Sequence, residues 1–291
     1  MKTTKLLGTA LFAVMAFTAC SNDDGVNSQR QEIKIVATIG ASDDNRTKAT
    51  FENDGSGEFE AGDEYTLIAW SQTLSNGGMY RYKIGETSLY WDADGWDGNP
   101  IDFIAWYPNY VFGGGYTQFY EVAAAASEDA KDLLIAPKVT VAKGNVVNLQ
   151  FKHMMHKLVV NLSSNYFSTA SLNNAVINLK NLKSSALVDF WNATVDASLA
   201  NGTESYASKL GAATSFIVAP QTLTTGSVML EIEIEGKTFV YKVPASLTTL
   251  ESGKVLTLNL SSNRDAIVLQ SSGIQPWGNQ DTINADVEEQ P

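Results

Sequence analysis

The sequence is poor in the residues that catalysis and metal binding use most. It holds one cysteine, Cys20, and two histidines, His153 and His156, among 291 residues. A single cysteine forms no disulfide within the chain, and two histidines alone leave a zinc site short of ligands. The hydrolase signatures G-x-S-x-G and H-E-x-x-H are both missing from the sequence. We therefore expect no catalytic residues, no cofactor and no resident metal.

Positive charge is scarce as well. Lys and Arg number 20 against 32 Asp and Glu, which gives a formal net charge of −12. Such a surface repels a phosphate backbone, so we expect no nucleic-acid partner. After the N-terminus no apolar stretch approaches the ~20 residues that a membrane-spanning helix needs.

The N-terminus predicts export. Lys2 and Lys5 precede an apolar run from Leu6 to Phe17, a pattern typical of a signal peptide. Small residues then lead into Cys20, as in the lipobox that lipoprotein signal peptidase cleaves. We predict a signal peptide over residues 1–19, lipidation at Cys20 and a polar tether over residues 20–31. The alternative is a soluble exported protein that is cut near Ala19.

The rest of the chain predicts an all-β fold. Hydrophobic residues make up 44% of the sequence, enough for a substantial core. Short runs with strand character recur between Gly, Asn and Asp, a pattern typical of a sandwich or barrel. One short helix is possible within 123–134. The predicted strands are Tyr65–Trp70, Met79–Ile84, Thr87–Trp91, Ile101–Tyr107, Gln118–Val122, Val146–Phe151, His156–Leu162, Ala175–Leu179, Phe216–Val218, a hairpin through Leu230–Val243, and Leu256–Leu260.

The first strand after the tether has a mainly apolar face. Ile33, Ile35, Ala37 and Ile39 alternate with more exposed positions, as expected of a strand with one side buried. A polar loop over residues 40–48 follows and carries Arg46.

Three groups of residues are candidates for binding, and each has a plainer explanation. His153 and His156 lie three residues apart, which places them on opposite faces of a strand, and their apolar neighbours favour core packing over a metal site. Asp92, Asp94 and Asp97 do not keep the register of an EF-hand, so a turn between strands explains them better than calcium does.

Aromatic residues are dense in one stretch. Such side chains serve either a sandwich core or exposed platforms for sugars, and we favour the core for most of them. Trp96 and Tyr116 are kept as candidate glycan contacts, since glycine-rich loops can present such rings outward. The cluster consists of Tyr80, Tyr82, Tyr90, Trp91, Trp96, Phe103, Trp106, Tyr107, Tyr110 and Tyr116.

The order and spacing of several segments resemble the fimbrillin family of Bacteroides-type surface lipoproteins. The resemblance runs across most of the chain, and no single piece of it is specific. It rests on Cys20 with the acidic Asp23-Asp24 after it, Arg46-Thr47 with Phe51 beyond, Phe59-Glu60-Ala61-Gly62-Asp63, Trp91, Asp102-Phe103-Ile104-Ala105-Trp106-Tyr107-Pro108, Asp132-Leu133-Leu134-Ile135-Ala136, and Val147–Leu158.

The resemblance implies two tandem transthyretin-like (Greek-key) β-sandwich domains. We place them at residues 32–156 and at residues 157–291, the second with a C-terminal extension. It further implies a pilus subunit at the outer surface that assembles by strand exchange. An arginine-specific protease would cut between Arg46 and Thr47 and release the strand of Ile33, Ile35, Ala37 and Ile39, and a neighbouring subunit's strand would replace it.

The donor strand and the final role stay open. Ile267–Leu269 and the series Ile283, Ala285 and Val287 are alternative donor segments, and Arg30 or Lys48 are alternative cleavage sites. The main competing function is a glycan-binding surface lipoprotein that forms no polymer. The expected partners are other pilus subunits, the processing protease, the outer membrane through the lipid, and a surface glycan or protein as the adhesion target.

Overall fold

The structure is a computed structural model that describes residues 30–40, 59–71, 76–92, 96, 100–109, 115–122, 132–204, 208–263 and 266–277. The chain divides into two units, Met1–Arg30 and Gln31–Pro291, and the fold belongs to the second. Nearly all regular structure in the described residues is β, which confirms the predicted fold class. No helix among these residues is long and apolar enough to cross a membrane.

The strands and the single described helix are bounded as follows. They are β1 Ile35–Ile39, β2 Glu64–Ser71, β3 Asn76–Lys83, β4 Ile101–Tyr107, β5 Thr117–Glu121, β6 Leu134–Val141, β7 Val147–His153, β8 His156–Ser164, α2 Thr169–Asn173, β9 Val176–Leu179, β10 Lys183–Asp189, β11 Thr194–Glu204, β12 Ser208–Leu210, β13 Ala213–Val218, β14 Gln221–Thr222, β15 Val228–Ile234, β16 Lys237–Lys242, β17 Thr249–Leu250, β18 Lys254–Ser262 and β19 Ile267–Pro276.

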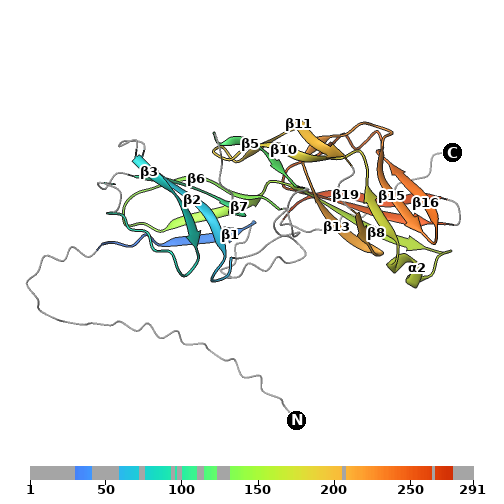
Figure 1. Ribbon diagram of the computed structural model, residues 1–291, viewed down its shortest axis with the longest axis horizontal. Helices are drawn as coiled ribbons and strands as arrows, with labels where there is room; N and C mark the ends of the chain where they lie inside the picture. The colour runs from blue at the N-terminus through green and yellow to red at the C-terminus, as the bar shows by residue number, and fades with distance from the viewer. Residues whose placement is uncertain are drawn as a thin grey trace, which may run out of the picture. The chain divides into compact units, whose positions relative to one another are not determined.

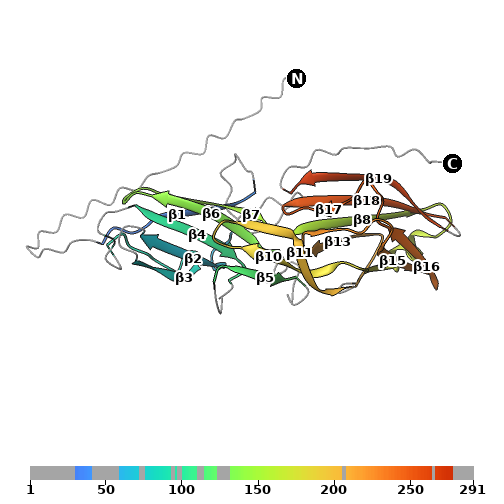
Figure 2. The ribbon, with the colours of Figure 1, turned by 90° about the horizontal axis from the view of Figure 1, so that it is seen from above.

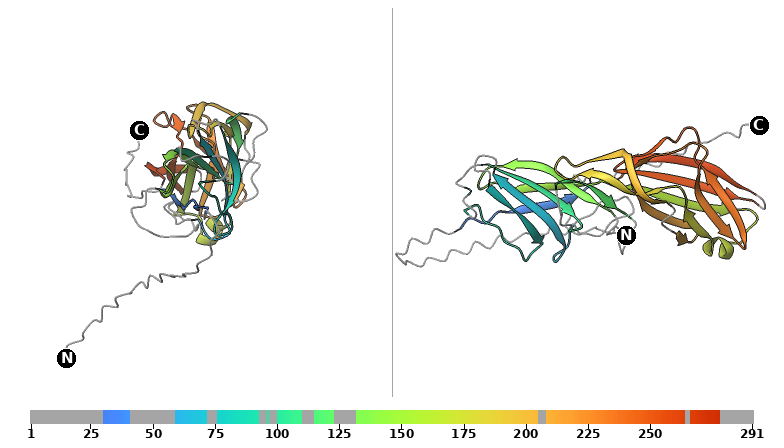
Figure 3. Two further views of the ribbon diagram at one scale, coloured as in Figure 1. Left: turned by 90° about the vertical axis from the view of Figure 1, so that its left-hand side faces the viewer. Right: turned by 45° about the horizontal axis from the view of Figure 1, so that its top comes forward.

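The first half of the chain forms a six-stranded sheet in the order β1-β7-β6-β4-β2-β3. Its strands are antiparallel except for β1, which runs parallel to β7. Figure 3 shows β1 in blue beside this sheet. Alternation places one set of side chains on each face, and in β7 every second residue from Val147 to His153 is buried.

One face of this sheet packs on large aromatic rings from irregular segments. Trp91 and Trp96 are 1% and 2% exposed and join Phe59 in the same core. Phe59 meets Phe151 of β7 edge-on, with ring centroids 4.7 Å apart. The prediction that most of the aromatic cluster is core is confirmed for Trp91, Phe103 and Trp106. Large rings can close such a face because each buries much area at little conformational cost.

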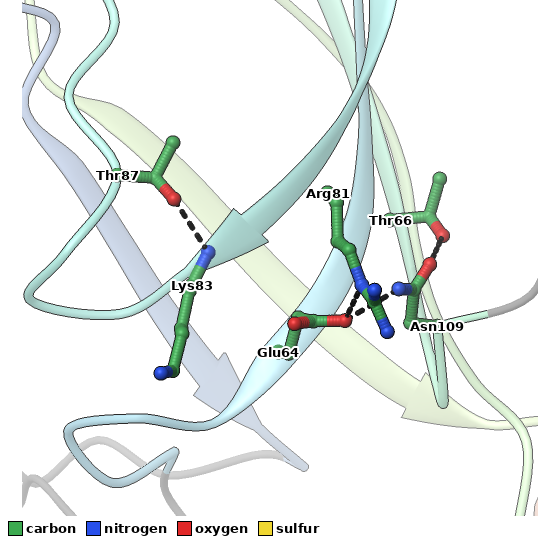
Figure 4. A network of polar contacts seen from close by, with 6 residues as sticks. All are labelled: Glu64, Thr66, Arg81, Lys83, Thr87 and Asn109. Atoms are coloured by element: carbon green, nitrogen blue, oxygen red, sulfur yellow. Dashed lines mark hydrogen bonds and ion pairs between the residues drawn. The ribbon is translucent and has the colours of Figure 1, made fainter.

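The open end of the β2–β3 hairpin is held by polar contacts (Figure 4). Glu64 on β2 accepts hydrogen bonds from Arg81 on β3 and from Asn109, which in turn accepts one from the Thr66 hydroxyl at 2.7 Å. Partial desolvation opposes ionisation of Glu64, but the hydrogen bonds from Arg81 and Asn109 and the positive charges of Arg81 and Lys83 outweigh it. They hold the pKa of Glu64 below its usual value.

The other face of the sheet packs against a second, three-stranded sheet in the order β11-β10-β5. This sheet joins β5 from the first half of the chain to β10 and β11 from the second half (Figure 1). Trp106, Tyr120, Phe190 and the turn residues Met154 and Met155 share the core between the two sheets. The predicted boundary near residue 156 falls beside this turn, where β7 ends and β8 begins, and it stays a prediction.

The second half of the chain contains two further four-stranded sheets, β12-β9-β15-β16 and β13-β8-β18-β19. Their facing side chains form one core, to which β8, β15 and β18 each contribute alternate residues. The predicted hairpin is present as β15 and β16. Glu235 and Gly236 between them both have positive φ, as a tight two-residue hairpin turn requires.

One local prediction is wrong, and another lies mostly outside the described residues. Thr87–Trp91 is not a strand, because Thr87–Leu89 have no regular structure and Tyr90 makes only an isolated bridge to Glu32. Most of the predicted helix within 123–134 lies outside the described residues, and Leu134 at its end begins β6. Short apolar runs of this kind do not by themselves distinguish strand from helix or turn.

A buried glutamine offers a test of this packing. The Gln221 side chain is 2% exposed, accepts a hydrogen bond from the Lys183 N–H at 2.8 Å and donates to the carbonyls of Lys183 and Ala219. Gln221→Leu removes these three hydrogen bonds at a buried position, so we expect the free energy of unfolding to fall by about 2 to 4 kcal/mol. Urea unfolding measures the loss. The exposed Gln270 is the matched control, and Gln270→Leu should change little; equal effects of the two would contradict this account.

A candidate strand-exchange site at the first strand

The first strand occupies an edge of the six-stranded sheet. β1 pairs in parallel with β7, and the register runs from Ile35 opposite Val147 to Ile39 opposite Phe151. The strand is held at its end by the Gly40 N–H, which donates to the Phe151 carbonyl at 3.0 Å. At the edge of a sheet a strand has one neighbour, so its removal breaks one ladder of backbone hydrogen bonds.

The residues just before β1 bind a different part of the chain. The Ile33 N–H donates to the Leu89 carbonyl at 2.8 Å, and the Trp91 N–H donates to the Gln31 carbonyl at 2.9 Å. Glu32 bridges Tyr90 in the antiparallel sense. The segment 31–40 therefore lies between β7 and the 88–92 segment and satisfies backbone groups of both.

The predicted apolar face of this segment lies in the core. Ile33 is 3% exposed and Ile39 is fully buried, while Ile35 and Ala37 pack against the same cluster. Val36, on the other side of β1, is 47% exposed. Burying an isoleucine side chain contributes about 1.5 to 3 kcal/mol, so loss of the segment would uncover a substantial apolar groove along β7.

Polar contacts at the entry to the segment are exposed and weak by comparison. The Gln31 N–H donates to Asp92 at 3.2 Å, and the Ser88 hydroxyl donates to Glu32 at 2.7 Å. Asp92 also forms an ion pair with Lys143. Exposed contacts of this kind contribute little to stability, so the buried isoleucines dominate the docking. Asp94 and Asp97 of the calcium hypothesis lie outside the described residues, which contain no metal-ligand cluster.

The remaining predicted site residues are only partly covered by the structure. Cys20, Arg46 and Thr47 lie outside the described residues. Trp96 is buried, so its ring has no free face for a sugar and its glycan role lacks structural support. Tyr116 is 37% exposed, and its ring centroid lies 5.2 Å from that of Trp191.

Both histidines are buried, in agreement with their prediction as core residues. His153 Nδ1 lies 2.6 Å from Asp132 Oδ2, and the His153 ring stacks on Trp277. His156 Nδ1 lies 2.8 Å from the Glu251 carbonyl, to which it donates as the neutral tautomer. Sequence reasoning missed the partners Asp132 and Trp277, which are 21 and 124 residues from His153 and are brought to it only by the fold.

The groove walls were also missed as site residues. Trp91 and Phe59 close the face under the first strand. In the sequence Trp91 belongs to the aromatic cluster and to the family pattern, and Phe59 only to the family pattern. Their distance from residues 33–39 along the chain gives no local signal for this contact.

The matches to known proteins identify the family and the fold. Residues 18–277 match the sequence profile of the family described as fimbrillin-like. The chain belongs to the fimbrillin-like family. Fimbrillin-like proteins are structural proteins, and the chain is accordingly not an enzyme, as expected.

Solved structures share the fold of this fimbrillin-like chain at low sequence identity. A candidate cell adhesion protein of Bacteroides uniformis is 18% identical, with a TM-score of 0.60 over 84% of this chain and 99% of the other. A candidate cell adhesion protein of Bacteroides ovatus is 17% identical, with a TM-score of 0.61 over 87% and 99%. The tip fimbrial protein Mfa3 of Porphyromonas gingivalis, truncated at its C-terminus, is 12% identical, with a TM-score of 0.50 over 84% and 100%. No curated protein sequence matches this chain significantly.

Paired substitutions on β1 test how the strand is held. Ile39→Asp places a carboxylate in the core, and we expect it to weaken docking of the segment by about 3 kcal/mol or more. Val36→Asp adds the same charge to the exposed side of the same strand and should change stability by less than about 1 kcal/mol. Hydrogen exchange of the β7 amides gives the readout. If the β7 amides exchange in both variants as slowly as in the unchanged chain, docking of the first strand does not depend on its buried face.

His156 predicts an acid-sensitive fold. Burial lowers the pKa of His156 to about 4 from 6.5, against an opposing effect of the hydrogen bond to Glu251. Between these values the unfolded chain binds the proton more readily, so the stability present above pH 6.5 is lost as pH falls towards 4, by about 1.4 kcal/mol per pH unit. His156→Asn keeps a donor and removes the titration, and should flatten this part of the curve. Urea unfolding from pH 7 to pH 4 checks it; identical slopes would rule out His156 as the cause.

Proposed function

We propose that this chain is a structural subunit of a cell-surface pilus, exported as a lipoprotein through Cys20 and assembled by protease-triggered strand exchange. Membership of the fimbrillin-like family supports a pilus-subunit or adhesin role and assembly with other pilus subunits at the cell surface. The observation that carries the mechanism is the first strand, which is buried along one face, lies at a sheet edge and bridges two separate segments.

The physical argument concerns what departure of that strand leaves behind. β7 would present unpaired backbone groups beside the hydrophobic surface that Ile33 and Ile39 now cover. An incoming strand with alternating apolar residues repairs both defects, and its ladder hydrogen bonds add affinity while the side-chain pockets set the register. The same backbone hydrogen bonds and apolar contacts that hold the first strand within one subunit would thus hold a neighbour's strand and bind two subunits together.

Cleavage between Arg46 and Thr47 fits this scheme by its position. Arg46 follows Gly40 by six residues, so a cut there severs the first strand from the rest of the fold and leaves β7 intact. The released piece would carry Cys20 and its lipid with it, which joins processing to detachment from the outer membrane.

The structure describes one of the two donor candidates. Ile267–Leu269 belongs to β19, where it pairs with β18, so donation from there requires β19 to leave its sheet. Ile283, Ala285 and Val287 lie outside the described residues.

A digestion experiment tests the proposal. The mature chain, treated with an arginine-specific protease, should form ladders on denaturing gels run without boiling and filaments by electron microscopy. Arg46→Ala should abolish assembly, Arg30→Ala should not, and an excess of a peptide with residues 32–40 should inhibit it by refilling the groove. A clean monomer after complete cleavage, with no polymer under any condition, would sink the proposal.

Glycan binding is a second candidate function, favoured by the exposed ring of Tyr116 beside Trp191. An aromatic pair of this kind can stack against the apolar face of a sugar. Glycan-array binding that Tyr116→Ala abolishes, with the fold intact, would support it, and the absence of binding across arrays would count against it.

A further inference from the structure

The end of the last described strand is anchored beside the turn between β7 and β8. β19 runs antiparallel along β18 (Figure 2) and ends at Pro276. The next residue, Trp277, contacts His153 at the end of β7. The indole ring stacks on His153, with ring centroids 3.9 Å apart and planes 7° from parallel. The Lys157 ammonium lies 5.7 Å from the same ring. Two residues of the turn region thus hold one side chain from the end of the fold.

Backbone contacts reinforce this anchor. The Trp277 N–H donates to the Gly253 carbonyl at 2.9 Å, and the Gly253 N–H donates to the Met155 carbonyl at 3.0 Å. A Cβ at Gly253, where φ is +65°, would lie 3.0 Å from the His153 carbonyl oxygen, so the close approach favours glycine here. The Ser252 hydroxyl donates to the Met154 carbonyl at 2.8 Å.

His153 is itself fixed, which makes it a firm support for the ring. It is buried and paired with the buried carboxylate of Asp132 at 2.6 Å. It is also the last residue of β7, and Phe151, two residues earlier on the same face, is the residue that pairs with Ile39 of the first strand. One strand therefore carries both the groove for the first strand and the support for Trp277.

The anchor also has a built-in weakness. The Trp277 indole N–H is buried and finds no acceptor among the described residues. An unpaired buried donor opposes docking, while the stack and the apolar burial favour it, so the two effects partly cancel. A contact of this kind holds a segment in place, and the free energy needed to release the segment stays small.

We propose that Trp277 is a clasp that locks the C-terminal strand β19 onto the end of β7, so that the strand accepting the first segment also controls when the C-terminal segment is free to leave. Loss of the first strand removes one of the two strands paired with β7, which weakens the support that β7 gives to His153 and so loosens the hold on β19. The consequence for pilus assembly rests on the proposed function, because it makes a subunit ready to donate only after it has been processed. The clasp itself is a property of the single chain.

Hydrogen exchange on the uncleaved chain tests the clasp without any polymer. Trp277→Ala should speed exchange of the β19 amides by about fivefold to tenfold, as expected from the loss of one ring stack. Trp277→Phe should restore most of the protection. Tyr166→Ala is the matched control, since it removes another ring with a lysine over it from the same half of the chain. Exchange in β9 and β15 reports whether the core stays folded.

The link through β7 has its own test in the same measurement. Ile39→Ala weakens docking of the first strand while sparing the fold, and it should raise exchange in β19 as well as in β7, whereas Val36→Ala should do neither. Unchanged β19 exchange in Trp277→Ala would overturn the clasp, and unchanged β19 exchange in Ile39→Ala would overturn its control by β7. Failure of every variant to polymerise after cleavage would instead refute the proposed function and leave the clasp standing.

Discussion

The edge of β7 that the first strand covers is the constraint on which the structure depends. A strand in the middle of a protein must have its backbone donors and acceptors paired on both sides, and its apolar face must be covered. β6 supplies one side of β7, and the short first strand supplies the other from more than one hundred residues away in sequence. Nothing else among the described residues pairs with that edge.

This arrangement stabilises the first strand but does not make the rest of the fold depend on it. The first strand contributes buried isoleucines and a ladder of hydrogen bonds, but it is joined to the fold through a single neighbouring strand and a short bridged segment. Most of the hydrophobic core lies elsewhere, in the sandwich of the second half and between the six-stranded and three-stranded sheets. The fold can therefore lose this one element, and the cost falls at one edge rather than across the whole core.

Local pattern was sufficient where burial repeats along a strand. The alternation at Ile33–Ile39 predicted a strand with one buried face, and the alternation through Leu230–Val243 predicted the β15–β16 hairpin together with its turn. The pattern failed at Thr87–Trp91, an irregular segment that buries Trp91 and makes an isolated bridge at Tyr90 without forming a strand. The pattern also could not distinguish the buried Trp96 from the exposed Tyr116. The identity of an aromatic residue does not show whether its ring faces the core or the solvent.

By itself the sequence determined the all-β class, the positions of several strands, the shortage of catalytic and metal-binding residue types, and the family pattern. These depend on composition and on near neighbours in the chain. Only the tertiary structure decided that β1 lies parallel to β7, that β5 joins β10 from the other half, and that Trp277 stacks on His153. The reason is physical. Pairing between distant segments is selected by the whole set of edges and faces that must be satisfied at once, and no local stretch of residues contains that information.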